Sequence, residues 1–175
     1  MIELRDFLPS DVPDLVSWID GPGSLILWSG PSAFRWPLDD AQLLSSLDTE
    51  RRRRRSWTAV ETNAPDTPLG HISLAREPHA STGRLGRVLV SPQARGRGLG
   101  ELLVTSVQQL AFNELHLHRL SLGVFAHNER ALHLYERLGF VREGTLREVC
   151  WVEGVWWSTV EMGLLDHEWR AARRH

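Results

Sequence analysis

The sequence predicts an α+β (mixed α/β) fold with about seven strands and about four helices. Three strand-like segments follow one another in the first half of the chain. A long amphipathic helix comes next, and two strand-like segments form a hairpin near the C-terminus. Because the strands do not alternate strictly with helices, this order excludes a doubly wound parallel sheet.

The first fifty residues are predicted to form a strand, two helices and the loop between them. Residues 2–8 alternate apolar and polar side chains, which is typical of a strand. Ser10 is expected to cap a short helix that ends before Gly21, and Asp39 to cap a second helix within 38–50. Residues 21–37 are rich in Gly, Pro and Ser, so they are predicted as a loop.

The rest of the chain supplies the remaining strands and the long helix. Residues 56–62, 68–77 and 84–90 are predicted strands, and leucines at helical spacing predict a helix from about Gly98 to Leu115. A strand at 119–125, a short helix closed by Gly139, and a hairpin turning at Glu153-Gly154 complete the prediction.

Composition limits the classes of function. The chain has 175 residues and a formal net charge of −2, which favours a single domain over residues 1–175 and argues against nucleic acid or an anionic membrane as a partner. One cysteine excludes an internal disulfide or a cysteine-based metal cluster, and no metal is expected. Neither a signal-peptide pattern nor an apolar run of ~18 residues is present, so we expect a cytoplasmic protein.

Glycines and arginines gather where the long helix is predicted to begin, in the stretch "ARGRGLGELL". A helix N-terminus leaves backbone N–H groups without partners and carries a partial positive charge, so it favours an anion such as phosphate. The stretch lacks both the dinucleotide pattern G-x-G-x-x-G and the G-K-[ST] of a P-loop. We therefore expect a phosphate-bearing ligand of another kind on the backbone of residues 95–101.

Two motifs resemble those of one enzyme family. Residues 95–100 fit R-x-x-G-x-G after a strand of the form V-x-V-x-P, and residues 128–140, "NERALHLYERLGF", fit N-x-x-A-x-x-x-Y-x-x-x-G-F. Both resemble the GNAT (GCN5-related) N-acetyltransferase superfamily, closest to its ribosomal-protein and small-amine acetyltransferases. The resemblance covers essentially the whole chain. It implies a central mixed, mostly antiparallel sheet, acetyl-CoA as cofactor and coenzyme A as product.

The resemblance assigns each motif residue a role. Val88, Leu89 and Val90 would offer backbone groups to the pantetheine arm and the acetyl carbonyl. Asn128 would bond the pantetheine, and Arg130 would reach the cofactor. The pyrophosphate would be held by the loop residues Arg95, Gly96, Arg97, Gly98, Leu99 and Gly100.

The implied reaction is direct attack of a primary amine on the thioester in a ternary complex. Tyr135 is the only tyrosine, and a phenol stays protonated at neutral pH, so it is expected to give a proton to the leaving thiolate. The base that deprotonates the amine is not evident. Glu77 is the candidate that we retain, with His71 and Glu148 as alternatives, although each also has an ordinary structural interpretation.

Trp28, Trp36 and Trp157 are expected to bind the acceptor through apolar or cation–π contact, while core packing is expected for at least half of the tryptophans. The acceptor would be a small amine, a polyamine or a protein N-terminus, and the protein a monomer or homodimer.

Two alternatives remain open at this point. The fold could sense acyl-CoA without turnover, or the run Arg51–Arg55 could contact RNA or an acidic partner. For the arginine run, we favour a solvated helix end.

Overall fold

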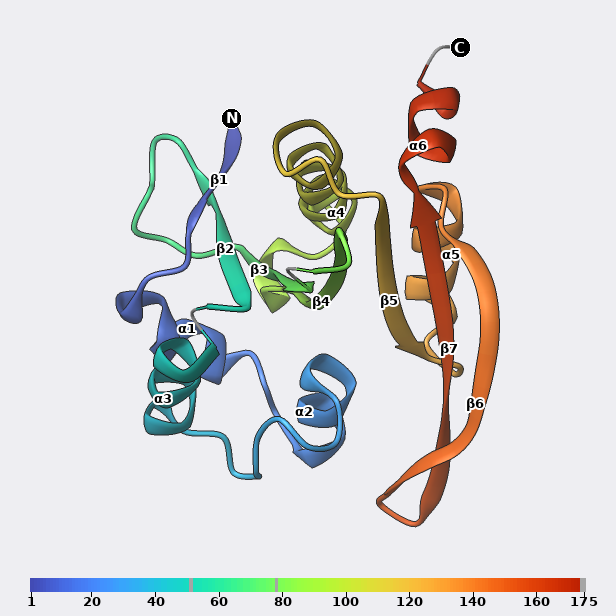
Figure 1. Cartoon of the computed structure of the whole chain (residues 1–175). Coiled ribbons are helices and arrows are strands. Elements are labelled where there is room, and N and C mark those ends of the chain that lie inside the picture. Colours follow the sequence, from blue (N-terminus) through green and yellow to red (C-terminus); the bar gives the residue numbers. More distant parts are fainter. Residues whose placement is uncertain (51, 78, 174–175) are drawn as a thin grey trace. The chain divides into compact units, whose positions relative to one another are not determined.

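The computed structural model describes residues 1–50, 52–77 and 79–173 (Figure 1). The chain divides into two compact units. The first comprises Met1–Ala75 and Gly86–Ser106, and the second comprises Arg76–Leu85 and Val107–His175. Strand β4 (Thr82–Val90) therefore contributes its first half to the second unit and its second half to the first.

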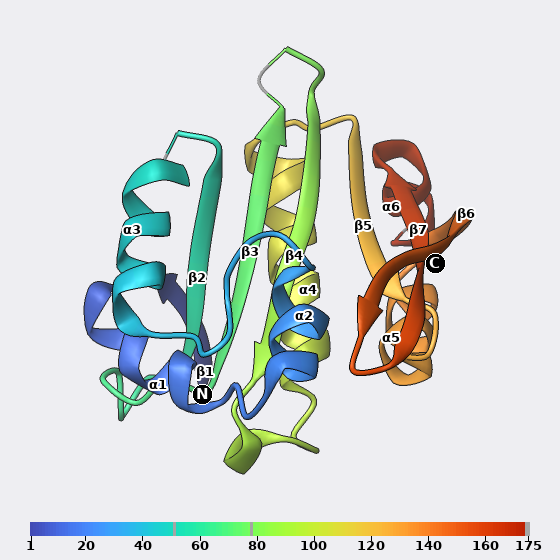
Figure 2. The same ribbon diagram turned by 90° about the horizontal axis from the view of Figure 1, so that it is seen from below.

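The first unit holds an antiparallel meander and the N-terminal helices. Strand β1 (Ile2–Asp6) pairs with β2 (Arg54–Glu61), and β2 pairs with β3 (Gly70–Glu77). Helices α1 (Val12–Ser17) and α3 (Asp40–Glu50) lie side by side, as Figures 1 and 2 both show. These two helices share a buried core with residues 22–29, and Leu15, Leu25 and Leu43 belong to it.

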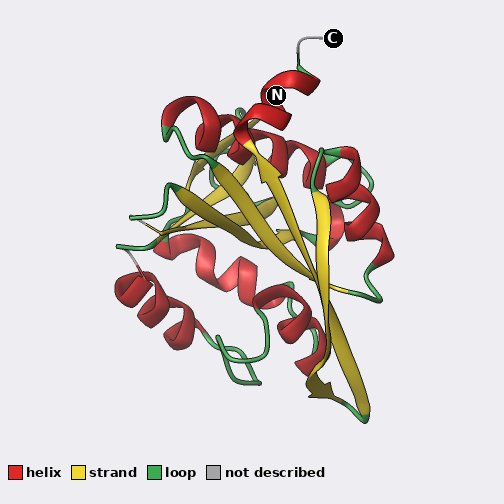
Figure 3. Cartoon of the chain, turned by 45° about the vertical axis from the view of Figure 1, so that its right-hand side comes forward, coloured by secondary structure: helices red, strands yellow, loops and turns green. Residues whose placement is uncertain are grey.

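The second unit is built on a parallel pair and a long hairpin. The start of β4 runs parallel to β5 (Arg119–Phe125), with Thr82–Arg84 opposite Arg119–Ser121. Strand β5 pairs antiparallel with β7 (Val155–Leu165), which pairs with β6 (Val141–Val152) in the hairpin drawn as long yellow strands in Figure 3. Helix α5 (Glu129–Arg137) follows β5.

Hydrogen bonding runs through seven strands of the described chain in the order β1-β2-β3-β4-β5-β7-β6. Only the β4–β5 pairing is parallel among the registers that are assigned. The predicted mixed, mostly antiparallel α+β sheet is thereby confirmed. In the part of the chain that the structure describes, no helix is long and apolar enough to cross a membrane.

Two helices were not predicted. Residues 21–37 were predicted as a loop, but α2 (Pro22–Ser29) forms there because Pro22 begins the helix and the Ser24 hydroxyl accepts a hydrogen bond from the Gly21 N–H at 3.0 Å. Helix α6 (Asp166–Ala172) is short and is anchored by buried Trp169.

The expected caps were partly wrong. Asp39 does cap α3, since its carboxylate accepts the Gln42 N–H at 2.9 Å. The expected Ser10 cap is replaced by the buried carboxylate of Asp11, which accepts the Leu8 N–H at 2.9 Å. The long predicted helix begins as α4 (Leu99–Gln109) and ends in a π-helical turn, Leu110–Glu114.

Candidate active site

Strand β4 has a kink immediately before the three residues expected to face the pantetheine arm. Arg87 has a φ of +53°, a left-handed conformation that is unusual for a residue with a side chain and interrupts the regular strand. Its carbonyl oxygen accepts the Trp28 indole N–H at 3.0 Å, and its guanidinium makes two 2.9 Å bonds to Glu50. The kink at Arg87 is therefore held through both its backbone and its side chain, just ahead of half-buried Val88, Leu89 and Val90.

The loop between β4 and α4 presents a run of unpaired backbone donors. Within the described residues, none of the N–H groups from Arg95 to Gly100 has a protein acceptor, whereas the N–H groups of Glu101 and Leu102 both bond the Gly98 carbonyl. Gly96 and Gly98 have φ values of +80° and +75°, and a Cβ on either would meet no protein atom within 4 Å. The loop therefore combines unpaired backbone donors with open space beside its glycines at a helix N-terminus, which suits a phosphate group.

The two arginines of this loop differ in their surroundings. Arg97 donates to the Glu61 carboxylate at 2.5 Å, and this guanidinium lowers the pKa of Glu61. Arg95 is exposed and has no hydrogen-bond or ion-pair partner among the described residues. Arg95 is therefore the more available cation for an anionic ligand.

Trp28, Trp36 and His71 all belong to the first unit but differ in exposure. Trp28 is buried, lies parallel to Phe34 at 5.7 Å, and contacts His71 edge-on at 5.9 Å. Trp36 is 46% exposed. Burial, with a smaller contribution from the nearby Arg87 charge, lowers the pKa of His71 to about 3, so this imidazole is neutral at pH 7 and a weak base.

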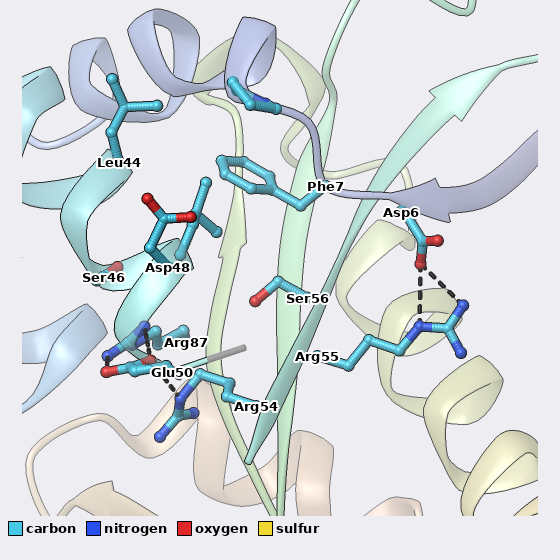
Figure 4. Close-up of a pocket in the computed structure, with 12 residues that line it drawn as sticks. Asp6, Phe7, Leu44, Ser46, Asp48, Glu50, Arg54, Arg55, Ser56 and Arg87 are labelled. Carbon is cyan, nitrogen blue, oxygen red and sulfur yellow. Dashed lines mark hydrogen bonds and ion pairs between the residues drawn. The ribbon is translucent and has the colours of Figure 1, made fainter. Parts of the chain in front are cut away.

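A pocket of about 460 Å³ in the first unit lies between α3 and the β1–β2 edge (Figure 4). Its charged walls are internally paired: Arg54 and Arg87 bind Glu50, and Arg55 binds Asp6. The last two arginines of the run, Arg54 and Arg55, therefore belong to strand β2 and form ion pairs, whereas the whole run was expected at a solvated helix end. Arg51 lies outside the described residues.

In the second unit, the motif residues Asn128, Arg130 and Tyr135 come together on α5. Asn128 is the N-cap, and its side-chain oxygen accepts the Ala131 N–H at 3.3 Å, which leaves its amide NH₂ as a donor. Arg130 is exposed. The predicted C-terminal glycine is confirmed, because Gly139 has a φ of +90°.

Tyr135 is buried against Phe140, and burial raises the pKa of its phenol to about 12. The hydroxyl therefore stays protonated throughout the physiological range. No hydrogen-bond partner for it is present in the described part of the chain. A donor with this pKa is a weak acid, better suited to hydrogen-bonding a forming thiolate than to early proton transfer.

The end of β5 carries an aromatic cluster that includes a residue missed by the sequence analysis. Trp157 on β7 contacts the Phe125 ring at 4.9 Å and the His127 ring at 4.3 Å. His127 stands just before the motif that begins at Asn128, and its neighbour Trp157 is thirty residues further along the sequence, so only the folded structure reveals the contact. Trp151 and Trp156 pack on each other near the hairpin turn and are exposed.

The candidate bases other than His71 occupy exposed positions. Glu77 ends β3 and is exposed, and its carbonyl accepts the Ala80 N–H in the turn that follows. Glu148 lies in an irregular part of β6, where its N–H donates to the Ser158 hydroxyl at 3.0 Å. Among the described residues, no group of three or more His, Cys, Asp or Glu side chains could hold a metal ion.

Comparisons with known proteins agree with the two motifs. The model of the acetyltransferase (GNAT) family matches residues 23–140. Spermidine N(1)-acetyltransferase of Escherichia coli (strain K12) is 28% identical over 141 residues, which are 81% of this chain and 76% of that protein. Mycothiol acetyltransferase of Paenarthrobacter aurescens (strain TC1) is 31% identical over 154 residues, 82% of this chain and 44% of that protein.

A solved structure shows the same fold. The spermidine N-acetyltransferase from Vibrio cholerae, in complex with CoA and spermine, superposes with a TM-score of 0.83 at 19% identity, covering 97% of this chain and 98% of that chain. The family model spans more than half of the sequence and includes both motifs. The chain therefore belongs to the acetyltransferase (GNAT) family and is an acetyl-CoA-dependent N-acetyltransferase.

Proposed function

We propose that this enzyme acetylates the primary amine of a small molecule of the polyamine or alkylamine class by direct attack of the amine on acetyl-CoA. The observation that carries the proposal is the loop from Arg95 to Gly100, whose six consecutive N–H groups have no acceptor among the described residues. Such a row of donors at the start of a helix is matched to a diphosphate.

The other motif residues take roles that fit their positions. The backbone at Val88, Leu89 and Val90 binds the acyl-pantetheine arm, with an N–H near Val90 available to the carbonyl oxygen as charge builds on it. The free amide NH₂ of Asn128 donates to the pantetheine, and Arg130 supplies a cation to the cofactor. The Tyr135 hydroxyl donates a hydrogen bond to the departing sulfur and stays protonated because burial raises its pKa.

Direct attack is favoured over a covalent acyl-enzyme. Cys150 is the only cysteine, it is buried, and burial raises the pKa of its thiol, so it is poorly suited to act as a nucleophile. The amine nitrogen therefore forms its bond to the acetyl carbon while both substrates are bound. Much of the rate enhancement is then expected from holding them together.

An amine of the polyamine class is supported by two observations. The relative from Escherichia coli is named a spermidine acetyltransferase, and half-buried Trp157, which packs on buried Phe125 and exposed His127, can offer its ring to a cationic alkyl chain through cation–π contact. A protein N-terminus is a second candidate acceptor, and Trp36, which is 46% exposed, is available to either.

The test measures thiol release from acetyl-CoA with spermidine, simple alkylamines and a short peptide bearing a free N-terminus. We expect release with spermidine or an alkylamine, together with thermal stabilisation by acetyl-CoA alone. Initial rates at varied concentrations of both substrates should give intersecting lines, because parallel lines would indicate an acyl-enzyme. Stabilisation without release from any amine would contradict the proposed function and favour an acyl-CoA sensor.

A further inference from the structure

His127 lies in the turn after β5, and its ring contacts two other aromatic rings. The imidazole is 4.3 Å from the Trp157 ring at an interplanar angle of 62°, and 6.0 Å from the Phe125 ring at 24°. Phe125 and Trp157 contact each other at 4.9 Å, so the three rings form a closed group. The His127 side chain is nevertheless exposed, which leaves a positioned imidazole open to solvent and to a ligand.

The backbone on both sides of His127 is fixed. The Ala126 N–H donates to the Ser158 carbonyl at 2.8 Å, and the Asn128 N–H donates to the Phe125 carbonyl at 2.9 Å. The His127 ring itself is uncommitted. In the part of the chain that the structure describes, neither of its nitrogens has a hydrogen-bond partner. A neutral imidazole therefore retains an acceptor nitrogen that no protein group uses.

His127 adjoins two residues to which roles were assigned above. His127 directly precedes Asn128, which would bond the pantetheine, and it contacts Trp157, which would line the acceptor site. Tyr135, the proposed donor to the departing sulfur, belongs to the same unit, so His127 adjoins one residue assigned to the cofactor and one assigned to the acceptor within the second unit. Neither exposed Glu77 at the end of β3 nor the buried imidazole of His71 combines accessibility with such neighbours.

We propose that His127 is the catalytic base that takes a proton from the acceptor ammonium group, an inference that rests on the proposed function. Of the three ammonium hydrogens, one passes to His127 and then to solvent. The neutral nitrogen forms a bond to the acetyl carbon, the carbon–sulfur bond breaks, and the sulfur leaves with its electron pair. A second hydrogen balances the proton gained by that sulfur, and the third stays on the amide nitrogen.

Charged side chains stand on each of the neighbouring elements α5, β6 and β7, Arg147 beside Glu148 among them. Glu129 and Arg130 begin α5, and Glu148 on β6 lies beside Ser158. Glu161 on β7 is bound to Arg84. Because Glu148 also carries a titratable carboxylate next to this cluster, the experiment includes its glutamine variant.

The experiment compares kcat and kcat/KM over a range of pH for wild type, His127→Phe, His127→Gln and Glu148→Gln, using the best amine of the panel. His127→Phe keeps an aromatic ring against Trp157 but removes the proton acceptor. His133→Gln, an exposed histidine on α5, serves as the matched control. Unchanged thermal stability and an unchanged stabilisation by acetyl-CoA show that each variant folds and binds the cofactor.

We expect both His127 variants to lose about 10²- to 10⁴-fold in kcat at pH 7 and His133→Gln to stay close to wild type, whereas a loss of that size in Glu148→Gln and not in the His127 variants would overturn the assignment to His127. The loss should shrink as the pH approaches ~10, where an alkylamine becomes neutral without help. A His127→Phe variant with wild-type kcat, or a loss that is the same at every pH, overturns the base assignment and leaves the proposed function standing. A wild-type enzyme that releases no thiol with any amine overturns both.

Discussion

Arg84 on β4 and Glu161 on β7 form a double ion pair, at 2.8 and 3.0 Å, across Gly123 on the intervening strand β5. A Cβ on Gly123 would lie 2.6 Å from the Arg84 guanidinium and 2.9 Å from the Glu161 carboxylate. The ion pair thus occupies the space that a side chain on β5 would fill. A second pair in the same unit, Arg119 on β5 with Glu143 on β6, spans Gly163 on β7 in the same manner.

Gly123→Ala should destabilise the protein by breaking this ion pair. The pair is half exposed, so we expect a loss of at most about 1 kcal/mol in the free energy of unfolding. In an Arg84→Ala background the same alanine should cost less, because the conflicting guanidinium is gone. Gly144→Ala on β6, where a Cβ meets nothing within 4 Å, is the control. Urea denaturation measures wild type, Gly123→Ala, Arg84→Ala, the double variant and Gly144→Ala, and strictly additive effects of the first two substitutions would show that the pair does not occupy this space.

Gly98→Asp should abolish acetyl-CoA binding because it places a carboxylate beside the row of free N–H groups. Gly98 has a φ of +75°, so Gly98→Ala reports the backbone strain alone and should weaken binding less. Gly154→Asp in the hairpin turn, where φ is +90°, puts the same side chain on a similar backbone far along the sequence and should leave binding intact. Thermal stabilisation by acetyl-CoA measures cofactor binding in the three variants. Wild-type affinity in Gly98→Asp would remove the phosphate-loop assignment.

Arg95 and Arg97 should differ in their contribution to cofactor binding. Arg97 is tied to Glu61, whereas Arg95 has no partner among the described residues. We expect Arg95→Ala to raise the KM for acetyl-CoA more than Arg97→Ala, and Glu61→Gln to lower it by releasing Arg97. The differences should diminish as salt is added, because exposed charges are screened. Equal effects of the two alanine variants would mean that the Arg97–Glu61 pair opens to bind the ligand.

The sequence predicted the strands and motifs better than the partners of their side chains. Alternation and apolar spacing located β5 and α4 because burial imposes those periods directly. Helix α2 was missed because Gly21, Pro22 and Ser24 are typical of loops, although here they begin a helix. Only the burial of Leu25 and Trp28 in the folded protein distinguishes this helix from a loop.

In the candidate site too, features set by local sequence spacing could be predicted, and contacts between distant segments could not. Asn128 and Tyr135 could be placed on one helix because their spacing is local, and the structure adds that Asn128 is the N-cap of this helix. The contact of His127 with Trp157 and the pair Arg97–Glu61 join residues far apart in the sequence, so they depend on strand pairing and side-chain direction. No local pattern in the sequence encodes either contact.

Tyr135→Phe should lower turnover by about 10²-fold or more and leave acetyl-CoA affinity nearly unchanged, because only the hydrogen bond to the departing sulfur is lost. Since Tyr135 is the only tyrosine, the phenolate absorbance of the protein reports this residue alone. It should titrate near pH 12, above the ordinary value of ~10, because the ring is buried. Unaltered turnover would exclude Tyr135 from the reaction, and a titration midpoint near 10 would show that its hydroxyl is solvated.

His71→Leu should make the protein less sensitive to acid. Burial lowers the pKa of His71 to about 3, below its ordinary value of ~6.5, so the folded state favours the neutral ring. The stability that depends on this ring is fully present above pH ~6.5 and is lost as the pH falls towards 3, at up to about 1.4 kcal/mol per pH unit, because the unfolded chain binds the proton first.

Leucine cannot take that proton, and it fills apolar space against Phe7 and Trp28 without the unpaired Nδ1 of the histidine. The free energy of unfolding of His71→Leu should therefore fall less than that of wild type as the pH is lowered from the ordinary histidine pKa of ~6.5 to about 4. Exposed His133→Gln should follow the wild-type curve. Parallel curves for wild type and His71→Leu would mean that the folded protein binds a proton at His71 as readily as the unfolded chain does, which would contradict the lowered pKa.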